Sequence, residues 1–255
     1  MLAPTTLLLL AQRNAASSLP KNNTWETTPI FWHSANVSGP LNAHALDFLT
    51  THRPAMITLE KSSMLNFPPL NSSGESKVLR QAGWIKDAFA EKGLSAPPIL
   101  FYTCSMGWNL APEEGNYDLY TKLPDRLFLR DSNGEHCTVD KPPGCARNNS
   151  CATQWKIFDL SQPEMVARWL QEMVAAPLAT GNISGIFVDS ANLQVGDGQW
   201  MSCNGELPKA KSDAWNAAHK ALLPRAQKLL DATKGHNRLS LSLSLSLSLS
   251  LSLSL

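Results

Sequence analysis

The sequence lacks several short motifs that identify common classes of enzyme. Neither GxGxxG nor GxxxxGK[ST] follows a predicted strand, which argues against a doubly wound sheet that binds nucleotides. The serine turn GxSxG and the zinc-protease motif HExxH are also missing. No CxxC pair with histidine partners favours a zinc site. The sequence therefore gives no support for a nucleotide, flavin, haem or dedicated metal cofactor.

An excess of charge of one sign and a long apolar run are missing as well. The 22 Lys and Arg residues nearly balance the 21 Asp and Glu residues, so no strong positive field indicates a nucleic-acid partner. No segment has the roughly 20 apolar residues that a transmembrane helix needs. Hydrophobic residues make up 43% of the chain, which suits a globular core. The oligomeric state stays open.

The two ends of the chain differ from its middle in composition. Near the N-terminus an apolar run, 7–11, precedes small residues at 15–18, which predicts a secretory signal peptide in residues 1–19. A basic n-region is missing, so a retained N-terminus is the alternative. At the other end, Leu239–Leu255 alternates strictly between Leu and Ser. We interpret it as a disordered or low-complexity tail that follows an interrupted domain at residues 20–238.

The cysteines are placed in loops, as is typical of an exported protein. Cys137, Cys145 and Cys151 lie in one polar stretch, Cys203 follows in a later loop, and Cys104 ends a predicted strand. Loop cysteines in such a protein usually form disulfides. The chain has five cysteines, so at least one of them cannot pair within the chain. The secretory route would also permit glycosylation at the Asn-x-Ser/Thr triplets, which begin at Asn22, Asn36, Asn71, Asn148 and Asn182.

Apolar strands alternate with amphipathic helices along the middle of the chain. A long irregular stretch, 105–154, interrupts this order and contains a possible short strand at 127–131; loops of this length are often functional. Ser161 is the expected N-cap of the helix that follows the fourth strand. The predicted strands are 29–33, 54–60, 98–104, 155–160 and 183–189, and the predicted helices are 41–49, 75–92, one that starts at 161, and 212–234.

Five strand-helix units predict a parallel α/β architecture. A polar or thiol residue closes each apolar strand: His33, Glu60, Cys104, Asp159 and Asp189. In a β/α barrel, that end of the strands carries the catalytic groups. We therefore expect a partial (β/α)8 TIM barrel of about five units, with the last three strands missing.

Two carboxylates at such a rim can cleave a glycosidic bond when one keeps a proton and the other stays ionised. Asp189 is the first candidate, because it ends the most apolar strand and small residues follow it. Glu60 is the second and Asp159 the third. The alternatives are structural: Asp189 could bond loop amides, Glu60 could form an ion pair with a basic rim residue, and Asp159 could hold the start of the helix at Ser161.

The same rim offers groups that could bind a sugar. Lys61 adjoins Glu60, and His33 is a ligand candidate whose alternative is a satisfied core histidine. Aromatic faces stack on the apolar faces of sugars, and we expect this role for Tyr102, Trp108 and Trp200. Core packing is the alternative for these three and the preferred interpretation of Trp32.

The strand-end strings, taken together and in order, resemble the glycoside-hydrolase-like TIM barrels over about residues 30–192. This resemblance implies a carbohydrate-active enzyme in which Asp189 is the natural catalytic candidate. The insertion at 135–151 and the missing strands depart from the family pattern. The strings are FWHSA at 31–35, ITLEK at 57–61, LFY at 100–102, LRDSNG at 129–134, FDLS at 158–161 and GIFVD at 185–189.

Three functional hypotheses follow from these patterns. The first is a secreted glycoside hydrolase that acts on a carbohydrate substrate. The second is a relative that binds carbohydrate without cleaving it. The third is a fragment without a stable fold, because an open sheet edge exposes unpaired backbone groups. The alternating tail could itself pair with such an edge.

Overall fold

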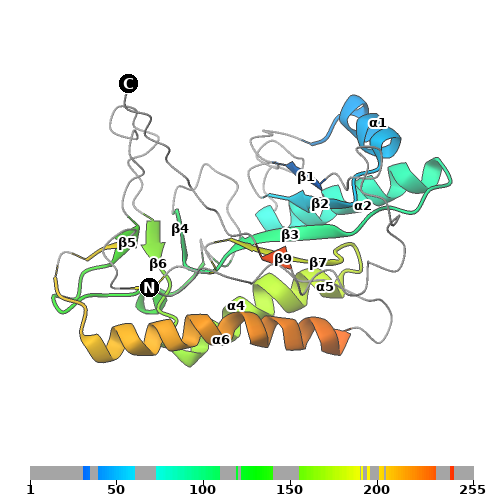
Figure 1. The fold of residues 1–255 in the computed structure, drawn as a ribbon. Coiled ribbons are helices and arrows are strands. Elements are labelled where there is room, and N and C mark those ends of the chain that lie inside the picture. Colours follow the sequence, from blue (N-terminus) through cyan, green and yellow to red (C-terminus); the bar gives the residue numbers. More distant parts are fainter. Residues whose placement is uncertain are drawn as a thin grey trace, which may run out of the picture.

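The computed structural model describes residues 31–34, 40–60, 73–109, 119, 122–139, 155–189, 191, 194–195, 201–203, 205–233 and 242–243. Helices and strands alternate at first, and a small second sheet follows (Figure 1). The predicted signal peptide and most of the Leu-Ser tail lie outside the described residues. The strands are β1 (Phe31–Ser34), β2 (Met56–Leu59), β3 (Ile99–Cys104), β4 (Gly107–Asn109), β5 (Thr138–Val139), β6 (Trp155–Ile157), β7 (Gly185–Asp189), β8 (Met201–Ser202) and β9 (Ser242–Leu243). The helices are α1 (Ala43–His52), α2 (Gly74–Glu91), the 3-10 turn η4 (Asp125–Leu127), α4 (Pro163–Leu170), the π-turn η6 (Gln171–Ala175), α5 (Ala176–Ala179) and α6 (Lys209–Thr233).

A parallel sheet with the strand order β1-β2-β3-β7-β9 forms one half of the molecule. The expected α/β architecture with parallel strands is therefore confirmed, and closure into a barrel stays a prediction. One strand assignment was wrong. The segment expected as the fourth parallel strand forms β6, which pairs antiparallel with β4 and β5 in another sheet. As a result, β3 lies directly beside β7.

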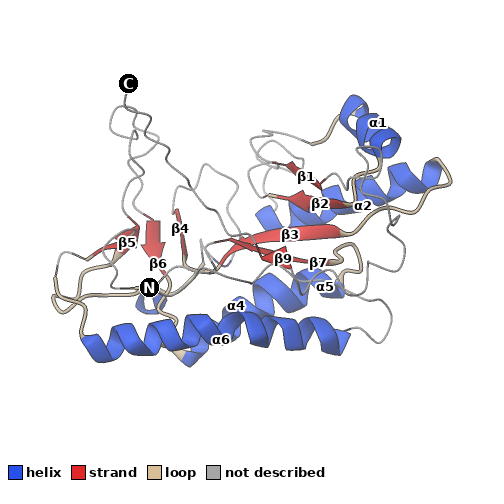
Figure 2. Cartoon of the chain, in the orientation of Figure 1, coloured by secondary structure: helices blue, strands red, loops and turns tan. Residues whose placement is uncertain are grey.

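The second sheet has the order β4-β6-β5-β8 and is antiparallel throughout (Figure 2). β4 and β5 come from the stretch 105–154 that the sequence left irregular, and β6 comes from the segment predicted as the fourth parallel strand. Instead of a strand at 127–131, the chain makes the turn η4 and then two isolated bridges, from Phe128 to Phe158 and from Arg130 to His136. A disulfide joins Cys137 to Cys203 and so links the residue before β5 to the residue after β8.

The helices begin and end close to the predicted positions, for identifiable local reasons. The side chain of Ser73 caps α2 by accepting a hydrogen bond from the amide of Ser76. Beyond the other end of α2, Gly93 takes a positive φ of 68° that favours glycine. The N-cap of α4 is Gln162 rather than Ser161, whose hydroxyl instead donates to the carboxylate of Asp159.

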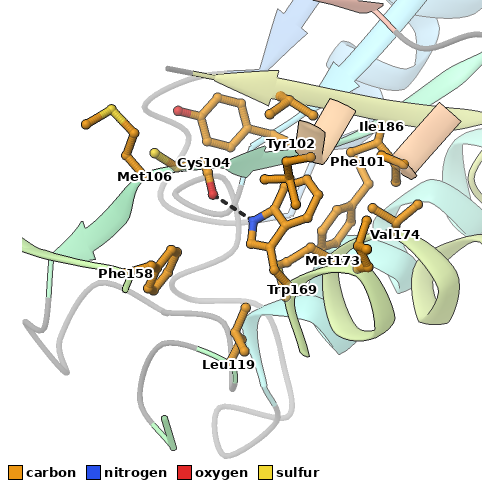
Figure 3. Packing of buried hydrophobic residues seen from close by; sticks show 14 of the residues in the cluster. Phe101, Tyr102, Cys104, Met106, Leu119, Phe158, Trp169, Met173, Val174 and Ile186 are labelled. Carbon is orange, nitrogen blue, oxygen red and sulfur yellow. Dashed lines mark hydrogen bonds between the residues drawn. The ribbon is translucent and has the colours of Figure 1, made fainter. Parts of the chain in front are cut away.

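The hydrophobic core lies between the parallel sheet and its helices. Figure 3 shows Phe101 of β3 and Ile186 of β7 pointing toward Trp169, Met173 and Val174 of the α4–η6 segment. The indole of Trp169 is fully buried and donates its N–H to the carbonyl of Cys104 at 3.0 Å. Burying an aromatic side chain of this size stabilises the fold by several kcal/mol, of order 3–5 when judged by truncation to alanine.

Helix α6 connects the two sheets. It packs against α4 and η6 and runs along one side of the molecule (Figure 1). Its fully buried Trp215 donates the indole N–H to the carbonyl of Phe158, next to β6, at 2.7 Å. One turn further along, the buried His219 packs on the Trp215 ring.

The Leu-Ser tail contributes one described strand. β9 pairs in parallel with β7, with Ser242 opposite Phe187 and Leu243 opposite Val188. The idea that the alternating tail can pair with an open edge of the sheet is thus confirmed for these two residues. They lie at the end of the strand order, next to β7.

Candidate active site

The register of the parallel sheet sets which residues share a face. His33 lies opposite Thr58, Thr58 opposite Leu100, and Leu100 opposite Gly185. Because side chains alternate along a strand, the residues two and four positions further along lie on the same face. That face therefore carries four of the predicted site residues: His33, Glu60, Tyr102 and Asp189. The opposite face carries Phe101 and Ile186 and packs on the helices.

The closest polar contact on this face joins Tyr102 to Asp189. The phenol hydroxyl donates to Oδ2 of Asp189 at 2.6 Å, which is short for a hydrogen bond between oxygens. Burial is the largest cause that raises the pKa of Tyr102, and electrostatic interactions with Cys104, Asp189 and Glu60 raise it further. The phenol therefore keeps its proton, and it stands in the field of both candidate carboxylates.

Glu60 lies beside His33. Oε2 of Glu60 is 3.9 Å from Nε2 of His33, and the two side chains are 18% and 42% exposed. An imidazolium at His33 would thus pair with the carboxylate, which corresponds to the ion-pair alternative for Glu60. Strand spacing puts the Cα atoms of Glu60 and Asp189 about 12 Å apart, two strands across and two residues along. Tyr102 is on β3, the strand between β2 and β7, and the charges of both carboxylates raise the pKa of its phenol.

Aromatic rings cover the same face. Phe187 stacks on Tyr102 with ring centroids 5.7 Å apart, and His33 lies 5.7 Å from Phe187. Phe31, two residues before His33, is 62% exposed. Phe187 and Phe31 were not among the predicted site residues. Alternation by two from Asp189 and from His33 is the signal that could have found them.

Asp159 has a different setting from Asp189. It lies beyond β6 and is almost fully buried. Its carboxylate accepts hydrogen bonds from Ser161 and from the Gln162 amide at 2.9 Å, and the ammonium of Lys211 is 3.3 Å away. These contacts match the structural alternative, in which Asp159 holds the start of α4.

The remaining predicted site residues divide into two groups. Trp32 is partly buried and packs against the core, which agrees with the core-packing role preferred for it from the sequence. Lys61 and Trp200 lie outside the described residues, and only the backbone of Trp108, which pairs with Lys156, is described. The roles of Lys61, Trp108 and Trp200 therefore stay predictions.

Among the residues that the structure describes, no cluster of His, Cys, Asp and Glu could hold a metal ion. Within the same residues, no helix has the length and apolar character needed to cross a membrane. Cys104 is buried and takes part in no disulfide within the described part of the chain.

No protein-family model and no curated protein matches the chain. Glycoside hydrolases of known structure are among the chains that are similar to this one over most of its length. The glycoside hydrolase domain of PelA from Pseudomonas aeruginosa matches over 85% of this chain with 13% identity and a TM-score of 0.45. The α-galactosidase TtGalA from Thermus thermophilus matches over 84% with 15% identity and a TM-score of 0.46. The dextranase FjDex31A from Flavobacterium johnsoniae matches over 84% with 9% identity and a TM-score of 0.49.

The chain spans 58% of the PelA domain, 37% of TtGalA and 25% of FjDex31A. It thus corresponds to part of each of these structures. The identities and TM-scores are too low to transfer substrate or chemistry to this chain.

Proposed function

We propose that the chain carries the active-site half of a glycoside hydrolase, with Asp189 and Glu60 as its pair of carboxylates. The observation that supports this most is the shared face of the sheet: Asp189 accepts a hydrogen bond from Tyr102, and the register puts Glu60, at the end of the neighbouring strand β2, on the same face. Paired carboxylates with distinct surroundings are what glycosidic cleavage requires. The described parallel strands would then belong to a TIM barrel whose remaining strands lie outside them.

Asp189 is assigned the part of the ionised carboxylate. A hydrogen bond from a phenol that keeps its proton stabilises the charge on Oδ2. An ionised aspartate at this place can attack the anomeric carbon, stabilise its developing positive charge, or activate a water. Retention and inversion both remain compatible with this role.

Glu60 is assigned the proton-transfer part. It is partly exposed, so the leaving oxygen of a substrate can reach it, and His33 beside it can exchange a proton or bind a sugar hydroxyl. The exposed ring of Phe31 and the half-buried ring of Phe187 supply apolar faces on which a sugar can stack. A carbohydrate is therefore the proposed substrate.

The Cys137–Cys203 disulfide supports an oxidising compartment, and we include secretion in the proposal. Export would also make the Asn-x-Ser/Thr triplets available for glycosylation.

The proposal is tested on the full chain with a panel of aryl glycosides and polysaccharides. Asp189→Asn is expected to reduce turnover by roughly 10⁴-fold, because the attacking or stabilising charge is lost. Its thermal midpoint should stay near that of the wild type. Asp159→Asn is the matched control: it should lower the thermal midpoint and leave turnover unchanged at a temperature where it is folded. Equal turnover of Asp189→Asn and wild type would refute the proposal.

The alternative of a non-catalytic relative that binds carbohydrate makes the opposite prediction. It should hold sugar equally well after Asp189→Asn and lose it after Trp108→Ala or Trp200→Ala. The alternative of a fragment without a stable fold predicts no cooperative thermal transition by circular dichroism.

A further inference from the structure

The Asp189 backbone is fixed by a buried residue that follows β3. Ser105 is fully buried, and both its amide and its hydroxyl donate to the carbonyl of Asp189 at 3.1 Å. Ser105 thus binds the last residue of β7 twice, at the point where the chain leaves the sheet. The side chain of the same residue accepts the hydrogen bond from Tyr102.

A histidine from a distant helix completes this arrangement. Nε2 of His219, on α6, lies 2.8 Å from the Ser105 hydroxyl, and its side chain is almost fully buried. A serine hydroxyl has one proton. The hydroxyl oxygen lies within reach of two partners, the carbonyl oxygen of Asp189 at 3.1 Å and Nε2 of His219 at 2.8 Å. The carbonyl can only accept, so when the Ser105 proton goes to it, Nε2 of His219 carries the proton of the second bond.

We propose that His219 and Ser105 are positioning residues of the site, linked in a directed chain from His219 Nε2–H to Ser105 Oγ–H to the carbonyl of Asp189. Each bond in such a chain polarises the next and strengthens it. The pair does not act as a nucleophile and its base, since both residues are buried away from any substrate. The positioning role rests on the proposed function of Asp189. The direction of the two hydrogen bonds is independent of that function.

The position of His219 is itself fixed. Its ring packs on Trp215 with centroids 4.8 Å apart, and Trp215 bonds the carbonyl of Phe158 beside the second sheet. Helix α6 therefore connects the antiparallel sheet to the strand end that presents Asp189. The proposal gives that helix a function beyond packing.

The protonation of His219 is measured first, by ¹⁵N NMR of the labelled full-length protein. A proton on Nε2, in the neutral or the doubly protonated ring, agrees with the proposal. A neutral ring protonated at Nδ1 alone would overturn it, because Ser105 would then have to donate to His219.

The positioning role is measured through the Tyr102 hydroxyl proton. Its resonance is assigned by its loss in Tyr102→Phe. His219→Leu should shift or abolish this resonance, whereas His219→Gln, whose amide can donate at the same place, should retain it. His52→Leu, on the exposed end of α1, is the control. An unchanged resonance in a folded His219→Leu protein would overturn the positioning role.

Kinetics then separate this inference from the proposed function. If the wild type cleaves glycosides, His219→Leu should lower kcat about 10-fold and leave KM within a factor of two, because one oriented contact is loosened. A wild type that cleaves none of them contradicts the proposed function, and the two NMR measurements still decide the hydrogen-bonded chain.

Discussion

The Tyr102 hydroxyl lies 2.6 Å from Oδ2 of Asp189, although 87 positions separate the two residues in the sequence. The sheet explains this proximity. Tyr102 pairs in register with Phe187, and Asp189 is two residues further along the same face of the neighbouring strand. The tyrosine ring therefore reaches diagonally toward the carboxyl end of β7, where the aspartate is.

Removal of this hydroxyl should weaken the site without unfolding the protein. A hydrogen bond to a charged group contributes about 1.5–3 kcal/mol, so Tyr102→Phe should lower turnover roughly 10- to 100-fold. The ring and its stacking on Phe187 remain. Steady-state kinetics and a thermal melt measure the two effects, and a loss of stability equal to the loss of activity would contradict this prediction.

Gly107 is expected to tolerate no side chain. A Cβ at this position would meet the carbonyl oxygen of Lys156 at 2.3 Å, and that backbone belongs to the paired strand β6. Gly107→Ala should therefore destabilise the protein by about 1–3 kcal/mol. Gly83→Ala is the matched control. Gly83 lies within helix α2, and its Cβ would be 3.4 Å from the side chain of Asn182, an ordinary van der Waals distance. It should be neutral or stabilising by about 0.5–1 kcal/mol. Urea unfolding compares the two variants.

The disulfide should stabilise the second sheet. It closes a loop across a sequence separation of 66 residues, for which the chain-entropy model gives about 4 kcal/mol. Cys203→Ala should lower the free energy of unfolding by a large part of this amount. Adding Cys137→Ala should then cost little more, because the bond is already broken. Additive losses in the double variant, measured by urea unfolding, would show that the bond does not form.

The stability of the second sheet should depend on the protonation of His136. Burial lowers the pKa of His136, and the charges of Lys156 and Arg130 add to this more than Asp125 opposes it. The unfolded chain therefore takes up a proton first as the pH falls below 6.5, the ordinary value. Stability from this residue is present above that pH and is lost as the pH falls through the folded pKa.

Urea unfolding at pH 7.5 and pH 5 should show this loss in the wild type and a smaller loss in His136→Gln. The exposed His52→Gln should behave as the wild type does. A pH dependence that His136→Gln leaves unchanged would exclude His136 as its source.

The sequence predicted much of the parallel half of the fold, because apolar runs and helical spacing are local signals. The positions of β1, β2, β3 and β7 and the ends of α2 follow from them. The segment 155–160 was misplaced for a physical reason. Its apolar run looks the same in a parallel strand as in a short antiparallel one, and only its partners β4 and β5 distinguish the two.

The candidate site also has residues that local sequence signals predicted and contacts that depend on distant parts of the chain. Strand-end position selected His33, Glu60 and Asp189, and aromatic character selected Tyr102. The register places all four on one face. The burial and ion pair of Asp159 could not be predicted, since Lys211 comes from a helix 52 positions away. The contact of His219 with Ser105 spans 114 positions and leaves no local pattern in the sequence.

The pairing of β9 with β7 has a consequence for how the edge of the sheet is protected. Because the tail repeats every two residues, a shift by one repeat would bring an identical Ser-Leu pair opposite Phe187 and Val188. Several Ser-Leu pairs of the tail could therefore form the same pairing with β7, in different registers. If one Ser-Leu pair were substituted, a neighbouring pair could move into the same register and pair with β7. The repeat therefore covers this edge of the sheet without fixing a single register.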